Sequence, residues 1–155
     1  MTNTTPPPID LAAVMHAYEL WEAAAAKLVP ENKQRLFTFL ASAHITRVIV
    51  TFDGEGDSGQ IEDIQPYKGE KEGKLPKGKV ELLDLPYGAK QVTARKRSAT
   101  DALEALAYEL LRAKHAGWEN SDGAYGDFTF DVAGGTITLD YNERFMSSEA
   151  HQYCW

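Results

Sequence analysis

The sequence predicts an α+β fold, a mostly antiparallel sheet with helices packed on it, in the order α-α-β-β-β-α-β-β. Two observations predict this class. Apolar residues recur at helical spacing in two stretches before residue 44 and in one after residue 98. Between and after these stretches lie short runs that are rich in β-branched or alternating apolar residues. Consecutive strands joined by short turns favour antiparallel pairing, which makes helices on a sheet an α+β architecture.

The first predicted helix begins after Asp10, a suitable N-cap. Its apolar residues at helical spacing are Leu11, Met15, Tyr18, Trp21, Ala25 and Leu28. Pro30 interrupts this pattern because proline lacks an N–H group and clashes with the preceding turn. A second helix follows over about 31–43. Its expected buried residues are Leu36, Phe37 and Leu40.

Three strands are expected next, over 45–52, 60–64 and 80–85. The first has apolar residues on both faces, which predicts a central strand that is covered on each side. We interpret 68–78 as a mobile basic loop because it has almost no apolar residues, and 86–97 as a second basic connection. Ser98 or Thr100 then caps the third helix. Its buried stripe comprises Leu103, Leu106, Leu110 and Leu111.

The last hairpin, 127–133 and 136–142, flanks two glycines, Gly134 and Gly135. A two-residue loop would pair Phe130 with Leu139 and place the apolar residues of both strands on one face. The opposite face would carry three carboxylates, with the third diagonal to the first two: Asp127, Asp131 and Asp140. Clustered carboxylates hold magnesium or manganese in two-metal hydrolases, but alternating Asp and Thr is also typical of a solvent-facing sheet.

Length and cysteine content indicate one domain in a reducing compartment. The 155 residues suit a single domain over 10–146, between tails at 1–9 and 147–155. The first is expected to be disordered. The single cysteine, Cys154, cannot form an internal disulfide. The N-terminus does not resemble a signal peptide, and no apolar run approaches the ~20 residues of a membrane span. We therefore predict a cytoplasmic protein without membrane contact.

Charge is unevenly distributed along the chain. The net charge is −7, but 68–97 carries nine basic and four acidic residues. Phosphate contacts dominate the affinity for nucleic acid, so an acidic chain is a poor general nucleic-acid binder. Nucleic acid or an acidic partner is therefore expected only at 68–97, with Arg95, Lys96 and Arg97 as its contacts. The alternative is a solvated basic loop.

The glycine-rich turn at 53–59 offers another candidate metal site. Asp53, Glu55 and Asp57 alternate along it and could supply oxygen ligands to a divalent cation. The turn is not an EF-hand loop, because Ser58 and Ile64 stand where glycine and glutamate are expected. The alternative is a solvated hairpin turn. The sequence indicates no other cofactor.

The segment 115–127 joins a helix to a strand and concentrates polar, aromatic and glycine residues. His115 with Glu119 or Asp122 could form an acid–base pair. Trp118, Asn120 and Tyr125 are candidate binding residues. In the alternative, Trp118 anchors the core and the polar residues satisfy turn amides. No nucleophile with a partner, phosphate-binding loop or zinc spacing is found, so an enzyme is the less favoured interpretation.

Three blocks of sequence suggest a family: 52–62, 115–128 and the closing Leu-Asp-Tyr-Asn-Glu-Arg at 139–144. Together they resemble an uncharacterised bacterial domain-of-unknown-function family that is often carried on proteobacterial plasmids and mobile elements. The resemblance covers roughly 45–145 and implies no activity. It does imply a mobile-element or phage-conflict setting.

The leading hypothesis is a non-enzymatic protein-interaction or regulatory module, for example an anti-CRISPR-like inhibitor, with another protein as its partner. An acidic face could compete for a surface meant for nucleic acid. Two alternatives remain. One is a metal-dependent hydrolase that uses the clustered carboxylates, and the other is a nucleic-acid binder that works through 68–97.

Overall fold

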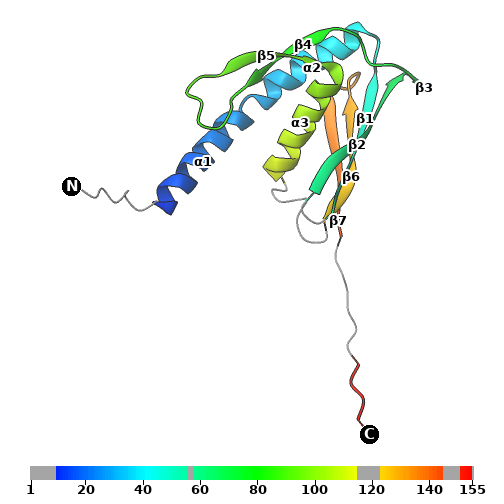
Figure 1. The fold of residues 1–155 in the computed structure, drawn as a ribbon. Helices are drawn as coiled ribbons and strands as arrows, with labels where there is room; N and C mark the ends of the chain where they lie inside the picture. The colour runs from blue at the N-terminus through cyan, green and yellow to red at the C-terminus, as the bar shows by residue number, and fades with distance from the viewer. Residues whose placement is uncertain (1–9, 56–57, 115–122, 145–150, 155) are drawn as a thin grey trace, which may run out of the picture.

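Three helices and seven strands make up the described part of the chain (Figure 1). The computed structural model describes residues 10–55, 58–114, 123–144 and 151–154. In chain order the elements are α1 (Leu11–Ala26), α2 (Val29–Ser42), β1 (Arg47–Glu55), β2 (Ser58–Lys68), β3 (Lys71–Glu72), β4 (Lys79–Asp84), β5 (Thr93–Ser98), α3 (Ala99–Lys114), β6 (Ala124–Asp131) and β7 (Thr136–Glu143). The predicted α+β class is confirmed. Two further strands, β3 and β5, lie in the segments interpreted as basic loops.

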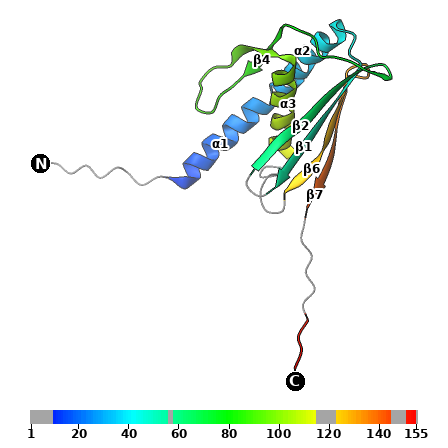
Figure 2. The ribbon, with the colours of Figure 1, turned by 45° about the vertical axis from the view of Figure 1, so that its right-hand side comes forward.

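The main sheet has five antiparallel strands in the order β3-β2-β1-β6-β7. β1 is central, as predicted. Its buried residues alternate, however, and Val48, Val50 and Phe52 all face the helices. The prediction that both faces are covered is therefore wrong. Ile49 and Thr51 lie on the opposite face, where no other element of the described chain packs (Figure 2).

The core forms between this inner face and the helices. Phe52, Phe128 and Phe130 are fully buried on the sheet side. They meet the predicted stripe of α2, which comprises Leu36, Phe37 and Leu40, and that of α3, in which Leu103, Leu106 and Leu111 are buried. Ser98, one of the two expected caps, accepts a hydrogen bond from the N–H of Asp101 (3.2 Å).

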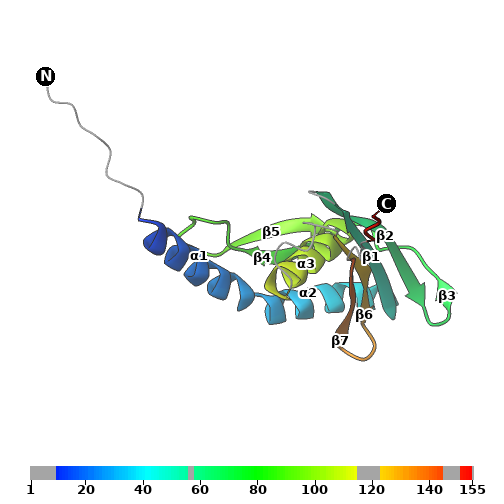
Figure 3. The same ribbon diagram turned by 90° about the horizontal axis from the view of Figure 1, so that it is seen from below.

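α1 extends away from the main sheet, alongside the β4–β5 hairpin (Figure 3). Asp10 caps it as predicted (3.2 Å to the N–H of Ala13). Only its last turns pack: Ala25 is buried, whereas Leu11 and Met15 are 69% and 58% exposed. The helical periodicity of α1 is therefore real, but half of its apolar stripe faces solvent. No helix among the described residues is both long and apolar enough to cross a membrane.

The β4–β5 hairpin packs against α2 and α3 instead of joining the main sheet. Val80 and Leu82 of β4 enter the core. Side chains of the helices satisfy the free edge of β4, since Asn32 accepts from the N–H of Leu83 (2.7 Å) and donates to its carbonyl oxygen (2.9 Å). The interpretation of 86–97 as a connection is thus wrong for residues 93–97. These residues belong to β5, which pairs with β4 along its whole length.

The register predicted for the last hairpin is wrong by two residues. Phe130 lies opposite Ile137, and the loop has four residues, 132–135. Asp131 accounts for the longer loop, since its carboxylate accepts from the N–H of Gly134 (2.9 Å) and its carbonyl from that of Gly135 (2.8 Å). Because the register is shifted by two residues, an even number, the side chains of the two strands still point to the faces that were predicted for them.

Candidate functional site

The outer face of the sheet carries a row of three carboxylates, from β2, β6 and β7, with Thr51 of β1 between the first two. Asp63 on β2 lies opposite Thr51 on β1, which in turn lies opposite Asp127 on β6. Asp127 lies directly opposite Asp140 on β7. We call Asp63, Asp127 and Asp140 the acidic row. The predicted diagonal placement of Asp140 is therefore wrong, and the two aspartates are nearest cross-strand neighbours, with Cβ atoms about 5 Å apart in such a pair.

The acidic row has no partner within the described residues, where none of its three side chains makes a hydrogen bond or ion pair. Like charges directly opposite each other destabilise a sheet. The Asp127–Asp140 pair is therefore unfavourable for stability, and no described residue neutralises the charge of the acidic row. Asp131, the third carboxylate predicted for this face, is instead engaged in the hairpin loop through Gly134.

Aromatic and apolar side chains border the acidic row. Arg47 stacks over Tyr67 (4.4 Å to the ring centroid) at one end of the face. Ile49, one row from the aspartates, is half-buried although no described element covers it. Tyr125, a predicted binding residue, is 44% exposed at the other end. The face thus carries aromatic residues and an arginine, which are enriched at protein-binding surfaces, beside its carboxylates.

Arg144 ties three strands together at the end of the sheet next to Tyr125. Its two Nη atoms donate to both carboxylate oxygens of Asp53 (2.8 and 3.1 Å). Nη1 also donates to the carbonyl oxygens of Gly54 (3.0 Å) and Ala124 (3.5 Å), and the guanidinium lies over the Tyr125 ring (4.6 Å). A bidentate pair of this kind fixes geometry as well as contributing energy.

We expect replacement of Arg144 by alanine to lower the free energy of unfolding by about 2 kcal/mol, because charged hydrogen bonds to Asp53 and two carbonyls are lost. Arg144→Lys should recover only part of the lost stability, because the ammonium group of lysine cannot form the bidentate pair with Asp53. Urea denaturation measures both. An Arg144→Ala loss below about 0.5 kcal/mol would show that the contact is only a surface ion pair.

The Arg144 pair changes the interpretation of the predicted metal site. Asp53 forms an ion pair with the guanidinium of Arg144. Asp57 and the side chain of Glu55 lie outside the described part of the chain. Within the described residues no three His, Cys, Asp or Glu side chains are grouped so that they could hold a metal ion. The carboxylates of the last hairpin do not form such a group either, although Asp127 and Asp140 are adjacent.

The predicted acid–base and binding residues of the preceding loop lie outside the described residues; they are His115, Trp118, Glu119, Asn120 and Asp122. The structure does place the ends of that loop. Gly123 accepts a hydrogen bond from the N–H of Arg144 (2.9 Å). Described residues from all three blocks that suggested a family therefore meet at Arg144, namely Asp53 and Gly54, Gly123 and Ala124, and Arg144 itself.

The basic cluster lies on β5, at the hairpin rather than on the main sheet. Arg95 and Lys96 are exposed, and Arg97 is half-buried. Acidic residues of β4 offset part of their charge, because Asp84 contacts Arg95 (3.9 Å) and Glu81 lies opposite Lys96. The cluster is thus part of a mixed-charge hairpin.

Two contributors to these surfaces were missed. Asp63 escaped notice because a bulge at Thr51 and Phe52 breaks the alternation of β2. Arg144 stood in the closing block, but its pairing with Asp53, 91 residues away, left no local signal. The hint in the sequence was a cation after a strand that ends in two polar residues, Asn142 and Glu143.

Residues 28–155 match the model of a protein family described as a family of unknown function, DUF6878. The match includes every strand, α3 and all of α2, and leaves α1 outside. It confirms the predicted resemblance to a domain family of unknown function at that level. Comparisons with curated proteins and with solved structures each found no match.

Proposed function

Because the chain belongs to DUF6878, a family of unknown function, its role is inferred from geometry, and we propose a non-enzymatic module that docks a basic protein surface on its acidic row. The observation that carries the proposal is that Asp127 lies directly opposite Asp140. Within the described chain neither side chain has a partner, and no other described element covers this face of the sheet. A basic surface would supply the counter-charge that this arrangement lacks.

The size of the face suits such a partner. Four long strands about 4.8 Å apart and about eight residues long span roughly 20 by 25 Å. That is the scale of the smaller specific interfaces, which bury several hundred Å² per partner. Tyr67 and Ile49 lie on this face, to one side of the charged residues, and would supply the apolar part of such a contact.

The setting we propose is the cytoplasm of a bacterial cell, in a mobile-element or phage-conflict context. An acidic face that occupies a basic surface competes with the nucleic acid which that surface normally holds. An anti-CRISPR-like inhibitor is one concrete form of this role. The support for it is the charge of the face and the resemblance in the three sequence blocks.

The test compares two double variants with the same change in net charge. Asp127→Asn with Asp140→Asn removes charge from the acidic row, whereas Glu19→Gln with Glu70→Gln removes it from exposed positions elsewhere. The probe is a fluorescein-labelled Lys/Arg-rich peptide, followed by anisotropy at ~0.15 M salt. We expect binding to weaken at least tenfold in the first variant only. Equal weakening in both would mean that net charge alone attracts the peptide, and the docking proposal would fail.

Asp127→Asn, which should weaken binding of the peptide, should at the same time stabilise the fold. Asp127→Asn removes the repulsion with Asp140, and we expect the free energy of unfolding to rise by about 0.5 kcal/mol. A residue that weakens binding when replaced yet stabilises the fold has the signature of a functional position. Thermal and urea denaturation at low salt measure the change. A clear loss of stability would instead give Asp127 a structural role.

A further inference from the structure

The last strand of the main sheet, β7, has a free edge. It pairs with β6 on one side and with no other described strand on the other (Figure 2). The carbonyl oxygen of Asp140 points at β6, since it would overlap with a Cβ atom on Gly126 of that strand. Backbone groups alternate along a strand, so the N–H and carbonyl groups of Ile137 and Leu139 point away from β6. Within the described residues nothing bonds to them on that side.

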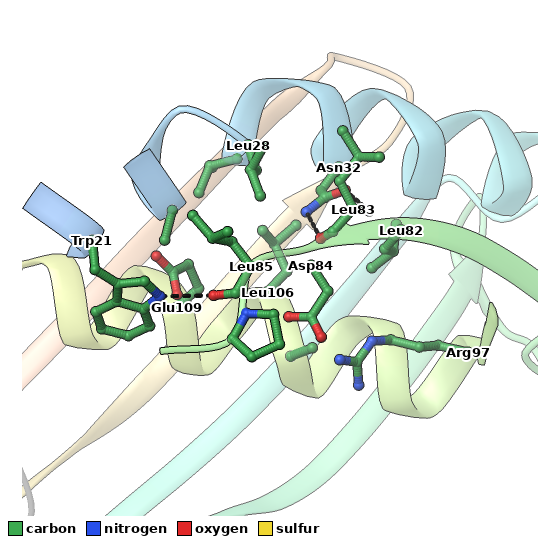
Figure 4. Close-up of a pocket in the computed structure, with 14 residues that line it drawn as sticks. Trp21, Leu28, Asn32, Leu82, Leu83, Asp84, Leu85, Arg97, Leu106 and Glu109 are labelled. Carbon is green, nitrogen blue, oxygen red and sulfur yellow. Dashed lines mark hydrogen bonds between the residues drawn. The ribbon is translucent and has the colours of Figure 1, made fainter. Parts of the chain in front are cut away.

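The other strand edges of the described chain carry protection. At the opposite side of the main sheet, β3 pairs with the end of β2, and the hydroxyl oxygen of Tyr108 on α3 accepts from the N–H of Ile61 (2.9 Å). At the edge of β4, both backbone groups of Leu83 bond to Asn32 (2.7 and 2.9 Å; Figure 4). The edge of β5 carries three cations at 95–97, which discourage strand pairing. β7 has no proline, lysine or bulge and no covering side chain of this kind among the described residues, so its edge is open to a further strand.

An apolar groove lies beside this edge, on the inner side of the sheet. Its volume is about 460 Å³, and it lies between one flank of α2 and the hairpin loop 132–135. Phe37 and Ala41 of α2 line it together with Val132 of the loop. Phe37 also packs on Phe130 of β6 (6.4 Å), the strand next to β7. Side chains of a strand added to β7 would therefore meet apolar walls on the inner side.

The two faces of β7 favour different side chains in an added strand. Ile137 and Leu139 point to the inner face and pack against the core, and Lys33 in the groove disfavours a second cation there. Asp140 is exposed on the outer face, where a basic residue opposite it would be favourable. Since side chains alternate along a strand, the best occupant has alternating apolar and basic residues. A second copy of β7 fits less well, because it would bring its own Asp140 to the same face.

We propose that β7 binds an extended segment of a partner protein as a sixth strand, in which basic residues alternate with apolar residues. The segment bonds to the outward backbone groups of Ile137 and Leu139. Its basic side chains lie beside Asp140, and its apolar side chains lie over the inner face towards the groove. This inference rests on the proposed function, because Asp140 belongs to the acidic row, and it adds how the basic partner is held.

The experiment uses the full chain and a fluorescein-labelled peptide of alternating lysine and valine, eight residues long like β7. Binding is followed by anisotropy at ~0.15 M salt. Two analogues of equal charge carry N-methyl groups, one on its valines and the other on its lysines. Each set of methyl groups removes the N–H donors from one edge of the peptide strand only. We expect one analogue to bind at least tenfold more weakly than the parent peptide and the other to bind like it.

A pair of protein variants tests the groove. Ala41→Arg narrows it from an exposed position of α2, whereas Ala23→Arg makes the same change in charge at an exposed position of α1 outside the lining. Arginine is a good helix former, so both variants should keep the fold. We expect Ala41→Arg to weaken binding of the parent peptide at least tenfold and Ala23→Arg to leave it unchanged. Equal effects of the two variants would exclude the groove from the binding site and overturn the proposed arrangement.

The methylated analogues also distinguish this inference from the proposed function. Equal binding of the two analogues would overturn strand addition, and the acidic row would still stand if Asp127→Asn with Asp140→Asn weakened binding of the parent peptide. A loss with one analogue only, together with full binding by that double variant, would overturn the acidic row and with it the choice of a basic strand. A dimer of the protein alone that the peptide dissociates would assign the β7 edge to a second copy and would also overturn the proposal.

Discussion

Replacing Gly126 by alanine should lower the free energy of unfolding by about 3 kcal/mol, the upper end of what overpacking costs. Gly126 lies on β6, facing the core, between β1 and β7. A Cβ atom at this position would overlap with the carbonyl oxygen of Asp140 and approach Cζ of Phe52 (3.1 Å). The first of these is backbone in a paired strand, so it cannot move aside without breaking the β6–β7 ladder.

Gly135→Asn provides the matched control. Gly135 lies in the loop of the same hairpin at φ +72°, with no atom within 4 Å of an added Cβ. Asparagine tolerates this left-handed conformation, so the loss should stay within about 1 kcal/mol. Urea denaturation of both variants distinguishes two requirements for glycine. Gly126→Ala tests the narrow space beside Asp140, and Gly135→Asn tests the left-handed backbone conformation. Equal losses would mean that the hairpin depends on glycine freedom and not on the narrow space at Gly126.

Local pattern predicted much of this fold. The apolar stripes of α2 and α3, the central place of β1 and the face of every residue in the last hairpin followed from spacing. The pairing register did not follow, because a shift of two residues still places Phe128 and Phe130 opposite apolar residues, now Leu139 and Ile137. A single polar contact, from Asp131 to the loop, decides between the two registers. Sequence alternation cannot express such a contact.

The candidate surfaces were predictable only in part. Alternation placed Asp127 and Asp140 on one face, but it could not show that they lie directly opposite each other. The covering of β1 on both faces was wrong since β-branched residues such as Ile49 suit an uncovered face as well. The contact between Trp21 and Leu85 could not be predicted at all, because these two residues are 64 apart in the sequence.

Removal of the Trp21 side chain should have an effect of similar size, a loss of about 3 kcal/mol in the free energy of unfolding on Trp21→Ala. Trp21 is the main anchor between α1 and the rest of the protein. It donates to Leu85, lies under the guanidinium of Arg112 (4.5 Å) and packs edge-on against Tyr87 (5.4 Å). Most of α1 is otherwise exposed, so little else holds this helix in place.

Trp21→Phe separates the ring from its hydrogen bond. Phenylalanine keeps most of the aromatic packing but leaves the carbonyl oxygen of Leu85 without its donor, which should cost about 1 kcal/mol. Urea denaturation gives the free energies, and amide exchange in α1 shows whether the helix detaches before the rest unfolds. Because α1 lies outside the residues matched to the family, a detached α1 over an intact sheet would identify it as an addition to a self-sufficient domain. A loss below about 1 kcal/mol for Trp21→Ala, with protection in α1 unchanged, would contradict the anchoring role.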